Sequence, residues 1–494
     1  MLFIVILAIL IAFSYEPPLE AWQITPASSA VAGVAAMVAV NWILAEAFAQ
    51  LTVRRIVRWP DSRGATLRSH QRLRWAHGAV LLGGFLAVVF GLDWPAVVRE
   101  TWGLGGWVLV DDLAVLAPFL ASVVVSHLAH CRVEHAARSC IAGDAALAGR
   151  PSLVRDVDFL LRHQLGVLLG PLFLLLTAQD VVSLVVGGTS MQAPAELVVG
   201  LGGLAAVLIF APVLLRWLWR ARPLPAGPLR ERLEAMARRL RFRASDILIW
   251  NTHGMVINAA VAGILPRPRY VLLSDALLDA LGPDEIEAVF GHEVGHIRHH
   301  HLWFYIGFLQ GATVFLLALM VAVRGLVETL LGGTAASQAV WLGQGLLLPL
   351  GCSALYFGVF FGFLSRRFER QADLFGCRAI SCGRRDCGGT HQPAEGGPGA
   401  VAICPTAIAT FVATLERIAL LNGSPRELRS WRHFSIAKRV EFLRRVAVEP
   451  GLERRFQAVV VTLKVLVLAA IVAAGWWAWF KSPELVAQLL EPLP

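Results

Sequence analysis

Residues 283–301 read PDEIEAVFGHEVGHIRHHH, and this stretch predicts a helix that carries two metal ligands. Pro283 is typical of the first helical position, and the acidic residues after it suit the positive end of the helix dipole. His292 and His296 are four residues apart, so both imidazoles lie on one face and can converge on one ion. Glu293, about 100° further round the helix, can reach a water molecule at that ion without being a ligand.

This HExxH pattern suits peptide hydrolysis, which needs a strong nucleophile and a polarised carbonyl group. Zinc lowers the pKa of a bound water molecule to about 7 and acts as a Lewis acid. Glu293 would accept the proton of that water and pass it to the leaving amine. The alternative is a helix with two ordinary histidines near a membrane surface, and a third ligand is needed to decide between the two.

The sequence downstream supplies a candidate for that third ligand. A metzincin would have a glycine three residues after His296 and a histidine three residues beyond it, but His299 and Leu302 stand there. Residues 365–376 read SRRFERQADLFG, with Glu369 and Asp373 four residues apart on a predicted helix. Glu369 can supply the third ligand. Asp373 can accept a hydrogen bond from a ligand imidazole and fix its tautomer.

The composition indicates a membrane protein. Hydrophobic residues make up 56% of the 494 residues and charged residues only 16%, below the quarter that is usual in soluble domains. A spanning helix needs about 20 apolar residues. The candidate spans are 1–14, 28–50, 77–97, 104–128, 164–187, 196–219, 303–323, 339–363 and 456–480. The first is short, and we expect a span there rather than a cleaved signal because no basic residues precede it.

The arginines between these spans indicate the orientation. Segments 51–76 and 129–163 are rich in arginine, whereas 15–27 and 183–195 have no basic residue. Under the positive-inside rule, the polar segments 220–302 and 364–455 then lie on the cytoplasmic side. The net charge of +9 reflects this bias, so no nucleic-acid partner is expected. Spans 303–323 and 339–363 form a hairpin that returns Glu369 to the membrane face of His296.

The sequence therefore predicts a mainly α, multi-span transmembrane protein with a cytoplasmic zincin-like α+β metallopeptidase domain split by a transmembrane hairpin. The expected parts are a multi-span region at 1–219, a first peptidase half at 220–302, the hairpin at 303–363, a second peptidase half at 364–455, and a last helix and tail at 456–494.

The order HEVGH, two spans and ERQAD resembles the membrane zinc metallopeptidases that include the type I CAAX prenyl proteases and the HtpX stress proteases, with a gluzincin-type ligand set. The resemblance covers residues 235–445. It implies that Asn258, Ala259 and Ala260 form an edge strand that pairs with the substrate backbone. The β-rich runs 247–250 and 255–261, followed by a strand at 270–273, support a small sheet there.

A second family element stands at 433–439, which reads HFSIAKR. The family usually has His-Pro at this place, with an arginine six residues after the histidine. His433 and Arg439 match this pattern, while Phe434 replaces the proline. The resemblance implies that His433 stabilises the oxyanion and that Arg439 supports the site. Without the resemblance, His433 is equally well a surface histidine.

Two further clusters of metal-binding residue types lie near these motifs. Cys377, Cys382, Cys387 and Cys404 surround a segment rich in glycine and proline that contains His391. Their spacing is not that of C-x₂-C pairs, so free thiols in a reducing compartment are favoured over a small structural metal site. The run His299–His301 is predicted to end an interfacial helix rather than to supply a fourth ligand, because catalytic zinc keeps an open position.

These observations predict an integral membrane zinc metalloendopeptidase with one catalytic zinc ion, multi-pass in a bacterial inner membrane, with its active site facing the cytoplasm. The expected partners are the lipid bilayer and peptide or protein substrates. The expected substrates are membrane-associated or misfolded proteins. One alternative is CAAX-type processing of lipidated C-terminal peptides. Another is a non-enzymatic transporter or scaffold with a decayed peptidase module, against which the complete ligand set argues.

Overall fold

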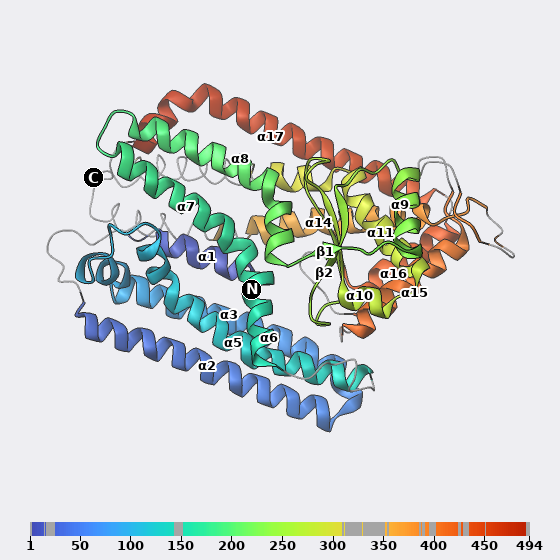
Figure 1. Ribbon diagram of the computed structural model, residues 1–494, viewed down its shortest axis with the longest axis horizontal. Coiled ribbons are helices and arrows are strands. Elements are labelled where there is room, and N and C mark those ends of the chain that lie inside the picture. The colour runs from blue at the N-terminus through green and yellow to red at the C-terminus, as the bar shows by residue number, and fades with distance from the viewer. Residues whose placement is uncertain are drawn as a thin grey trace. The chain divides into compact units, whose positions relative to one another are not determined.

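The chain forms two compact units in the computed structural model (Figure 1). The first comprises Met1–Arg230, Arg243–Leu281 and Arg417–Pro425, and the second comprises Glu231–Phe242, Gly282–Glu416 and Arg426–Pro494. The residues that the structure describes are 2–13, 15, 25–142, 152–308, 311, 329, 351–352, 355–384, 387, 391–394, 402–422, 426–427, 434–449 and 451–490.

Helices make up most of the first unit, and several of them are long and apolar. They are α1 (Leu2–Phe13), α2 (Ala27–Arg58), α3 (Arg63–Gly91), α4 (Trp94–Ala96), α5 (Val110–Ala142), α6 (Leu153–Phe159), α7 (Gly166–Val186) and α8 (Gln192–Leu218), with short helical turns at Pro60–Ser62, Val97–Thr101 and Leu160–Leu165. Helices α2, α3 and α5 pack side by side, as do α7 and α8 (Figure 1). Small residues such as Ala45, Ala49 and Ala129 are buried in the contact of α2 with α5, and short side chains let membrane helices approach closely.

Six helices in the described part of the chain are long and apolar enough to cross a membrane. They are Ala27–Arg58, Arg63–Gly91, Val110–Ala137, Leu153–Val186, Gln192–Leu218 and Leu452–Ala473. Each overlaps one of the predicted spans, and α1 matches the short span predicted at the N-terminus. The predicted hairpin spans 303–323 and 339–363 lie largely outside the described residues. The prediction of a mainly helical, multi-span membrane protein is confirmed.

The described parts of the arginine-rich segments 51–76 and 129–163 are largely helical. Helix α2 continues to Arg58, α3 already begins at Arg63, and α5 extends to Ala142. Arginine is a good helix former, so the helices continue beyond their apolar windows. Conversely, α5 starts only at Val110, six residues later than the predicted span, because the preceding residues form turns.

The same unit contains a four-stranded sheet in the order β1-β2-β4-β3. The strands are β1 (Arg222–Pro223), β2 (Asp246–Trp250), β3 (Ala259–Ala262) and β4 (Tyr270–Ser274), and the short helix α10 (Asp275–Ala280) follows β4. The aliphatic strands β2 and β4 pair in parallel at the centre. Strand β3 pairs antiparallel with β4 alone, with Ala259 opposite Leu273. It is therefore an edge strand, as the family resemblance implied.

The second unit contains α11 (Pro283–Arg298), α14 (Gly362–Ala379), α16 (Ile436–Val448) and α17 (Leu452–Leu490), together with most of α9 (Pro228–Arg239) and α15 (Pro405–Leu421) and a π-helical turn at Tyr356–Phe361. Helix α11 begins at Pro283 as predicted, and the backbone N–H of Gly282 donates to Glu285 Oε2 at 2.8 Å. Helix α14 packs against α11, α16 and α17. This packing joins the two motifs that lie about 70 residues apart in the sequence.

Candidate metal centre

Helices α11 and α14 cross at close range because glycines lie at their contact. A Cβ atom on Gly376 would lie 3.1 Å from the backbone nitrogen of His292, and one on Gly295 would lie 3.2 Å from the Cα of Ala372. Both distances are shorter than an ordinary van der Waals contact between heavy atoms. The absence of side chains at these points lets α14 bring Glu369 to the histidines of α11.

We predict that Gly376→Ala displaces the two helices and weakens metal binding. Overpacking of this kind costs about 1–3 kcal/mol, because the new methyl group would meet backbone atoms of α11 and the ring of Phe411. The measurement is the zinc content and the thermal unfolding midpoint of the protein purified in detergent. Gly475→Ala on α17 is the matched control, since a Cβ there has nothing within 4 Å. Equal zinc content and midpoint in Gly376→Ala and Gly475→Ala would contradict the prediction.

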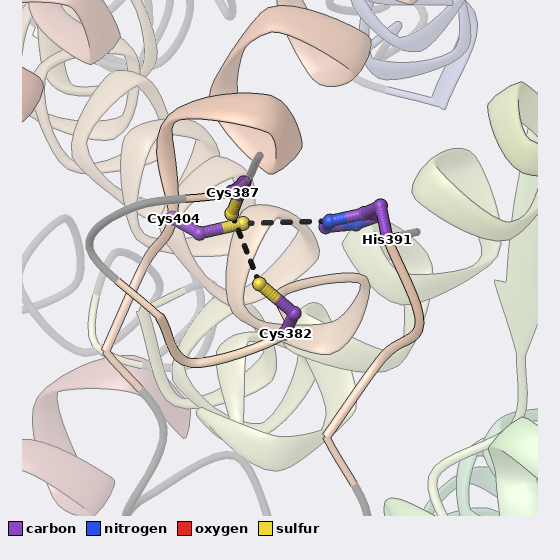
Figure 2. Close-up of side chains that lie close together, drawn as sticks. All are labelled: Cys382, Cys387, His391 and Cys404. Carbon is purple, nitrogen blue, oxygen red and sulfur yellow. Dashed lines mark hydrogen bonds between the residues drawn. The ribbon is translucent and has the colours of Figure 1, made fainter. Parts of the chain in front are cut away.

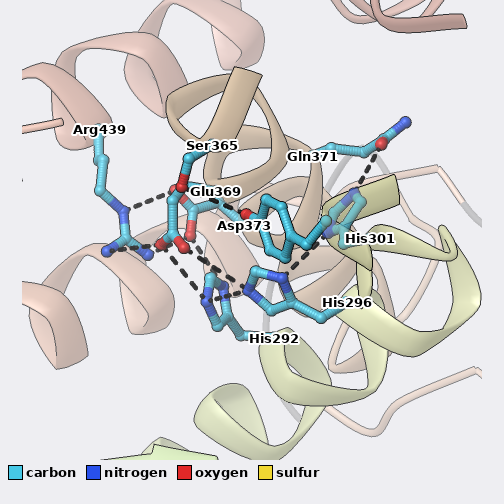
Figure 3. A network of polar contacts seen from close by, with 9 residues as sticks. His292, His296, His301, Ser365, Glu369, Gln371, Asp373 and Arg439 are labelled. Carbon is cyan, nitrogen blue, oxygen red and sulfur yellow. Dashed lines mark hydrogen bonds and ion pairs between the residues drawn. The ribbon is translucent and has the colours of Figure 1, made fainter. Parts of the chain in front are cut away.

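The structure brings the three predicted ligands together (Figure 3). The Nε2 atoms of His292 and His296 lie 3.2 Å apart. The carboxylate of Glu369 lies 3.8 Å from the first of them and 3.7 Å from the second. The two histidines are half-buried and Glu369 is buried, so the three ligand atoms face one another in a site partly removed from water.

Asp373 and Arg439 form a charged pair behind these ligands. Asp373 is completely buried, and its Oδ1 lies 3.0 Å from Nδ1 of His292. Arg439, on α16, donates from Nε to Asp373 Oδ2 at 2.8 Å and from Nη2 to Oδ1. Its Nη1 lies 3.6 Å from Glu369 Oε2. Arg439 therefore positions both carboxylates, and Asp373 stands where it can orient one ligand imidazole, as the sequence predicted.

His301 takes the corresponding place behind His296, which the sequence did not predict. Nδ1 of His301 lies 3.0 Å from Nδ1 of His296, and its Nε2 donates to Gln371 Oε1 at 2.9 Å. The predicted helix over 283–301 is too long, because α11 ends at Arg298 and His300 has a φ of 58°. This left-handed residue turns the chain, so His301 is fully buried while His300 is exposed.

The network continues through Gln371 to the last apolar helix. Nζ of Lys464, on α17, donates to Gln371 Oε1 at 3.1 Å and to the carbonyl oxygen of His299 at 2.7 Å. Gln371 lies between the two acids in ERQAD, and Lys464 is a single charge in an apolar run. These two positions were the only hints of the network that we find in the sequence. The residues that they contact lie in distant segments, so the sequence did not reveal the contacts.

The polar neighbours of both ligand histidines favour one tautomer for each. The oxygen of Gln371 can only accept, so His301 carries its proton on Nε2 and accepts at Nδ1 from the Nδ1–H of His296. The carboxylate of Asp373 likewise places a proton on Nδ1 of His292. Both Nε2 atoms therefore present lone pairs to each other and to Glu369. Three acceptors that face one another without a proton between them fit a bound cation.

The electrostatics of the site agree with this arrangement. Burial lowers the pKa of His296 to about 3, so this imidazole is neutral and can act as a ligand. Burial also lowers the pKa of His292, but the contact with Asp373 and the charge of Glu369 outweigh it and raise that pKa. Burial raises the pKa of Asp373, but Arg439 and His292 outweigh it and keep the carboxyl ionised. The site accumulates negative charge where a cation would lie.

The remaining predicted site residues lie at separate places. Glu293 is half-buried on α11, between the two ligand histidines in sequence. Asn258 precedes the edge strand β3 of the first unit, and its backbone N–H donates to Ser274 Oγ at 3.0 Å. Phe434, which replaces the family's proline, has the guanidinium of Arg370 at 4.0 Å from its ring centre. His433 lies outside the described residues.

Comparisons with known proteins agree with these motifs. Residues 223–391 match the model of peptidase family M48. The chain is 30% identical to the CAAX prenyl protease 1 homolog of Arabidopsis thaliana over 33% of this chain and 40% of that protein. It is 28% identical to Protease HtpX of Xylella fastidiosa (strain M12) over 34% of this chain and 50% of that protein. The chain thus spans half or less of the length of these curated relatives.

A solved structure extends the likeness beyond the peptidase motifs. The crystal structure of S. mikatae Ste24p matches 85% of this chain and 99% of its own with a TM-score of 0.50 and 16% sequence identity, which is a likeness of fold. The fold of most of this chain, apolar helices included, therefore has a counterpart among solved structures. Residues 223–391 thus match peptidase family M48, and the chain as a whole resembles the membrane-spanning metallopeptidases of that family.

Proposed function

We propose that this protein is an integral membrane zinc metalloendopeptidase. The observation that carries the proposal is the meeting of His292, His296 and Glu369 with their lone pairs directed at one point. Two imidazoles and one carboxylate make up a common ligand set of catalytic zinc, which keeps a fourth position open. One catalytic zinc ion per chain is therefore expected.

The residues around the ligands have separate tasks in this mechanism. Zinc at the site would supply a Lewis acid and lower the pKa of water. Glu293 accepts a proton from the attacking water on its carboxylate and passes it to the nitrogen of the leaving amine. Asp373 and His301 hold the Nδ1 protons of the ligand histidines, so that Nε2 stays available. Arg439 offsets the charge of the two buried carboxylates.

Two further groups are proposed to act on the substrate. An extended peptide adds to a free sheet edge through its backbone hydrogen bonds, and β3 is an edge strand. We assign substrate pairing to Asn258, Ala259 and Ala260 on this basis. His433 is proposed to stabilise the oxyanion, on the family resemblance alone.

The proposed substrates are membrane-associated or misfolded proteins. Several of the relatives are named Protease HtpX, and the long apolar helices of this chain support substrates that lie in or near a bilayer. A second candidate is the processing of lipidated C-terminal peptides, because another relative is named CAAX prenyl protease 1 homolog. A decayed, non-enzymatic module is disfavoured, because nothing would retain an unused ligand set. We propose that the active site faces the cytoplasm at a bacterial inner membrane, and the arginine-rich segments between the spans support this orientation.

Peptide mapping in native membranes tests the function and separates the two substrate classes. Membranes that contain the wild-type protein are compared with membranes that contain Glu293→Gln, with and without a zinc chelator. We expect new internal cleavage sites in membrane proteins that appear only with the wild type and disappear with the chelator. A purified prenylated peptide is the second arm, and its cleavage at the C-terminus alone would favour the CAAX-type activity. No chelator-sensitive cleavage in either arm would overturn the peptidase proposal.

A further inference from the structure

Three cysteines and one histidine meet between α14 and α15, shortly after the ERQAD motif in sequence. Cys382, Cys387, His391 and Cys404 each offer one ligand atom, and these four atoms all lie within 4.8 Å of one another (Figure 2). The sulfurs of Cys382 and Cys387 lie 3.0 Å apart. The sulfur of Cys404 lies 3.9 Å from Nδ1 of His391. All four side chains converge on a common centre.

These distances are close to those of a tetrahedral zinc site. With Zn–S near 2.3 Å and Zn–N near 2.0 Å, the donor atoms of such a site stand about 3.3–3.8 Å apart. The separation of Cys382 from Cys387 is just below this range and that of Cys404 from His391 is just above it. Small side-chain rotations would therefore bring these donors to the distances of a zinc site. All three cysteines are free thiols. Three thiolates and one imidazole form a known ligand set of structural zinc.

The surroundings orient two of the four donors for this task. Nε2 of His391 lies 2.9 Å from the carbonyl oxygen of Ile380, so this nitrogen carries the proton and Nδ1 presents its lone pair to the cysteines. The sulfur of Cys404 is buried and accepts the backbone N–H of Ala407, in the first turn of α15, at 3.4 Å.

We propose that Cys382, Cys387, His391 and Cys404 hold a second, structural zinc ion that fastens the segment between α14 and α15. The four protein donors leave no position open for a substrate, which distinguishes this site from the peptidase centre. Its anchor at the end of α14 connects it to the helix that carries Glu369 and Asp373. The sequence had grouped Cys377 with these cysteines, but Cys377 is fully buried on α14 and His391 takes the fourth place.

Cobalt substitution separates this site from the peptidase centre. Sulfur-to-cobalt charge transfer in the near ultraviolet requires thiolate ligands, and the histidines and glutamate of the peptidase centre have none. We expect the full chain, purified in detergent under reducing conditions and loaded with Co²⁺, to show this band, and the zinc form to hold about two ions per chain. Zinc analysis of His292→Ala should still find about one ion per chain. If the protein shows the charge-transfer band but no peptidase activity, the peptidase proposal fails and the cysteine-site proposal stands.

Substitutions identify the ligands. The double variant Cys382→Ser, Cys387→Ser should lose the band and one zinc ion, whereas the control Cys352→Ser should keep both. His391→Cys should retain the ion and strengthen the band, because a fourth thiolate replaces the imidazole. Wild-type protein without the band would overturn the proposal, as would a double variant that keeps all its zinc. A disulfide between Cys382 and Cys387 in the metal-loaded protein, seen by mass spectrometry without reduction, would also overturn it.

Discussion

Glu293→Gln is expected to lower the rate of peptide hydrolysis by about 10²–10⁴-fold, the usual contribution of a general base, while the zinc content stays that of the wild type. The amide keeps the size of the carboxylate but cannot accept the proton of the attacking water. Glu293 stands beside His292 on α11 but is not among the three grouped ligands, so its replacement leaves the donor set intact.

The measurement is the cleavage rate of a peptide substrate together with the metal content of the same preparation. Glu441→Gln is the matched control, because Glu441 is exposed on α16 and its substitution should change neither quantity. Hydrolysis at the wild-type rate by Glu293→Gln would refute its assignment as the base. Loss of zinc in that variant would instead make Glu293 part of the ligand set.

Asp373→Ala is expected to destabilise the protein and to weaken zinc binding together. The substitution leaves Arg439 buried without its bidentate partner, and breaking a buried pair in this way costs about 3–5 kcal/mol. Arg439 still has the carboxylate of Glu369 as an ion-pair partner at 3.6 Å. We therefore expect a loss of unfolding free energy at the lower end of that range. Loss of the group that orients His292 should reduce zinc affinity about 10–100-fold.

A double variant separates the two effects. In Asp373→Ala, Arg439→Met the unpaired buried guanidinium is removed, while Glu369 loses its arginine partner, so part of the unfolding free energy should return while zinc affinity stays low. Thermal unfolding of the metal-free protein and zinc titration measure the two quantities. Asp284→Ala is the control, because Asp284 pairs with Arg232 at the surface with its side chain 78% exposed, where a pair contributes about 0–1 kcal/mol. Full recovery of zinc affinity in the double variant would contradict the proposal that Asp373 orients His292.

The membrane spans and the central motif were predictable because their signals are local. An apolar run of about 20 residues is read directly from composition, and six such runs are helices in the described structure. The four-residue spacings of His292 with His296 and of Glu369 with Asp373 follow from the period of a single helix. The edge strand at Ala259–Ala262 was predictable from its family resemblance and its β-rich neighbours.

The partners of these residues were decided by the tertiary structure. One left-handed residue at His300 ends α11 and places His301, rather than His300, behind the site. Arg439 and Lys464 reach their partners from helices far along the chain. The sequence by itself determined which side chains share one helix face, because that depends on a fixed backbone period. Only the packing of α11 against α14 at their glycines decided which faces meet, because that depends on steric fit between segments that are not neighbours in the chain.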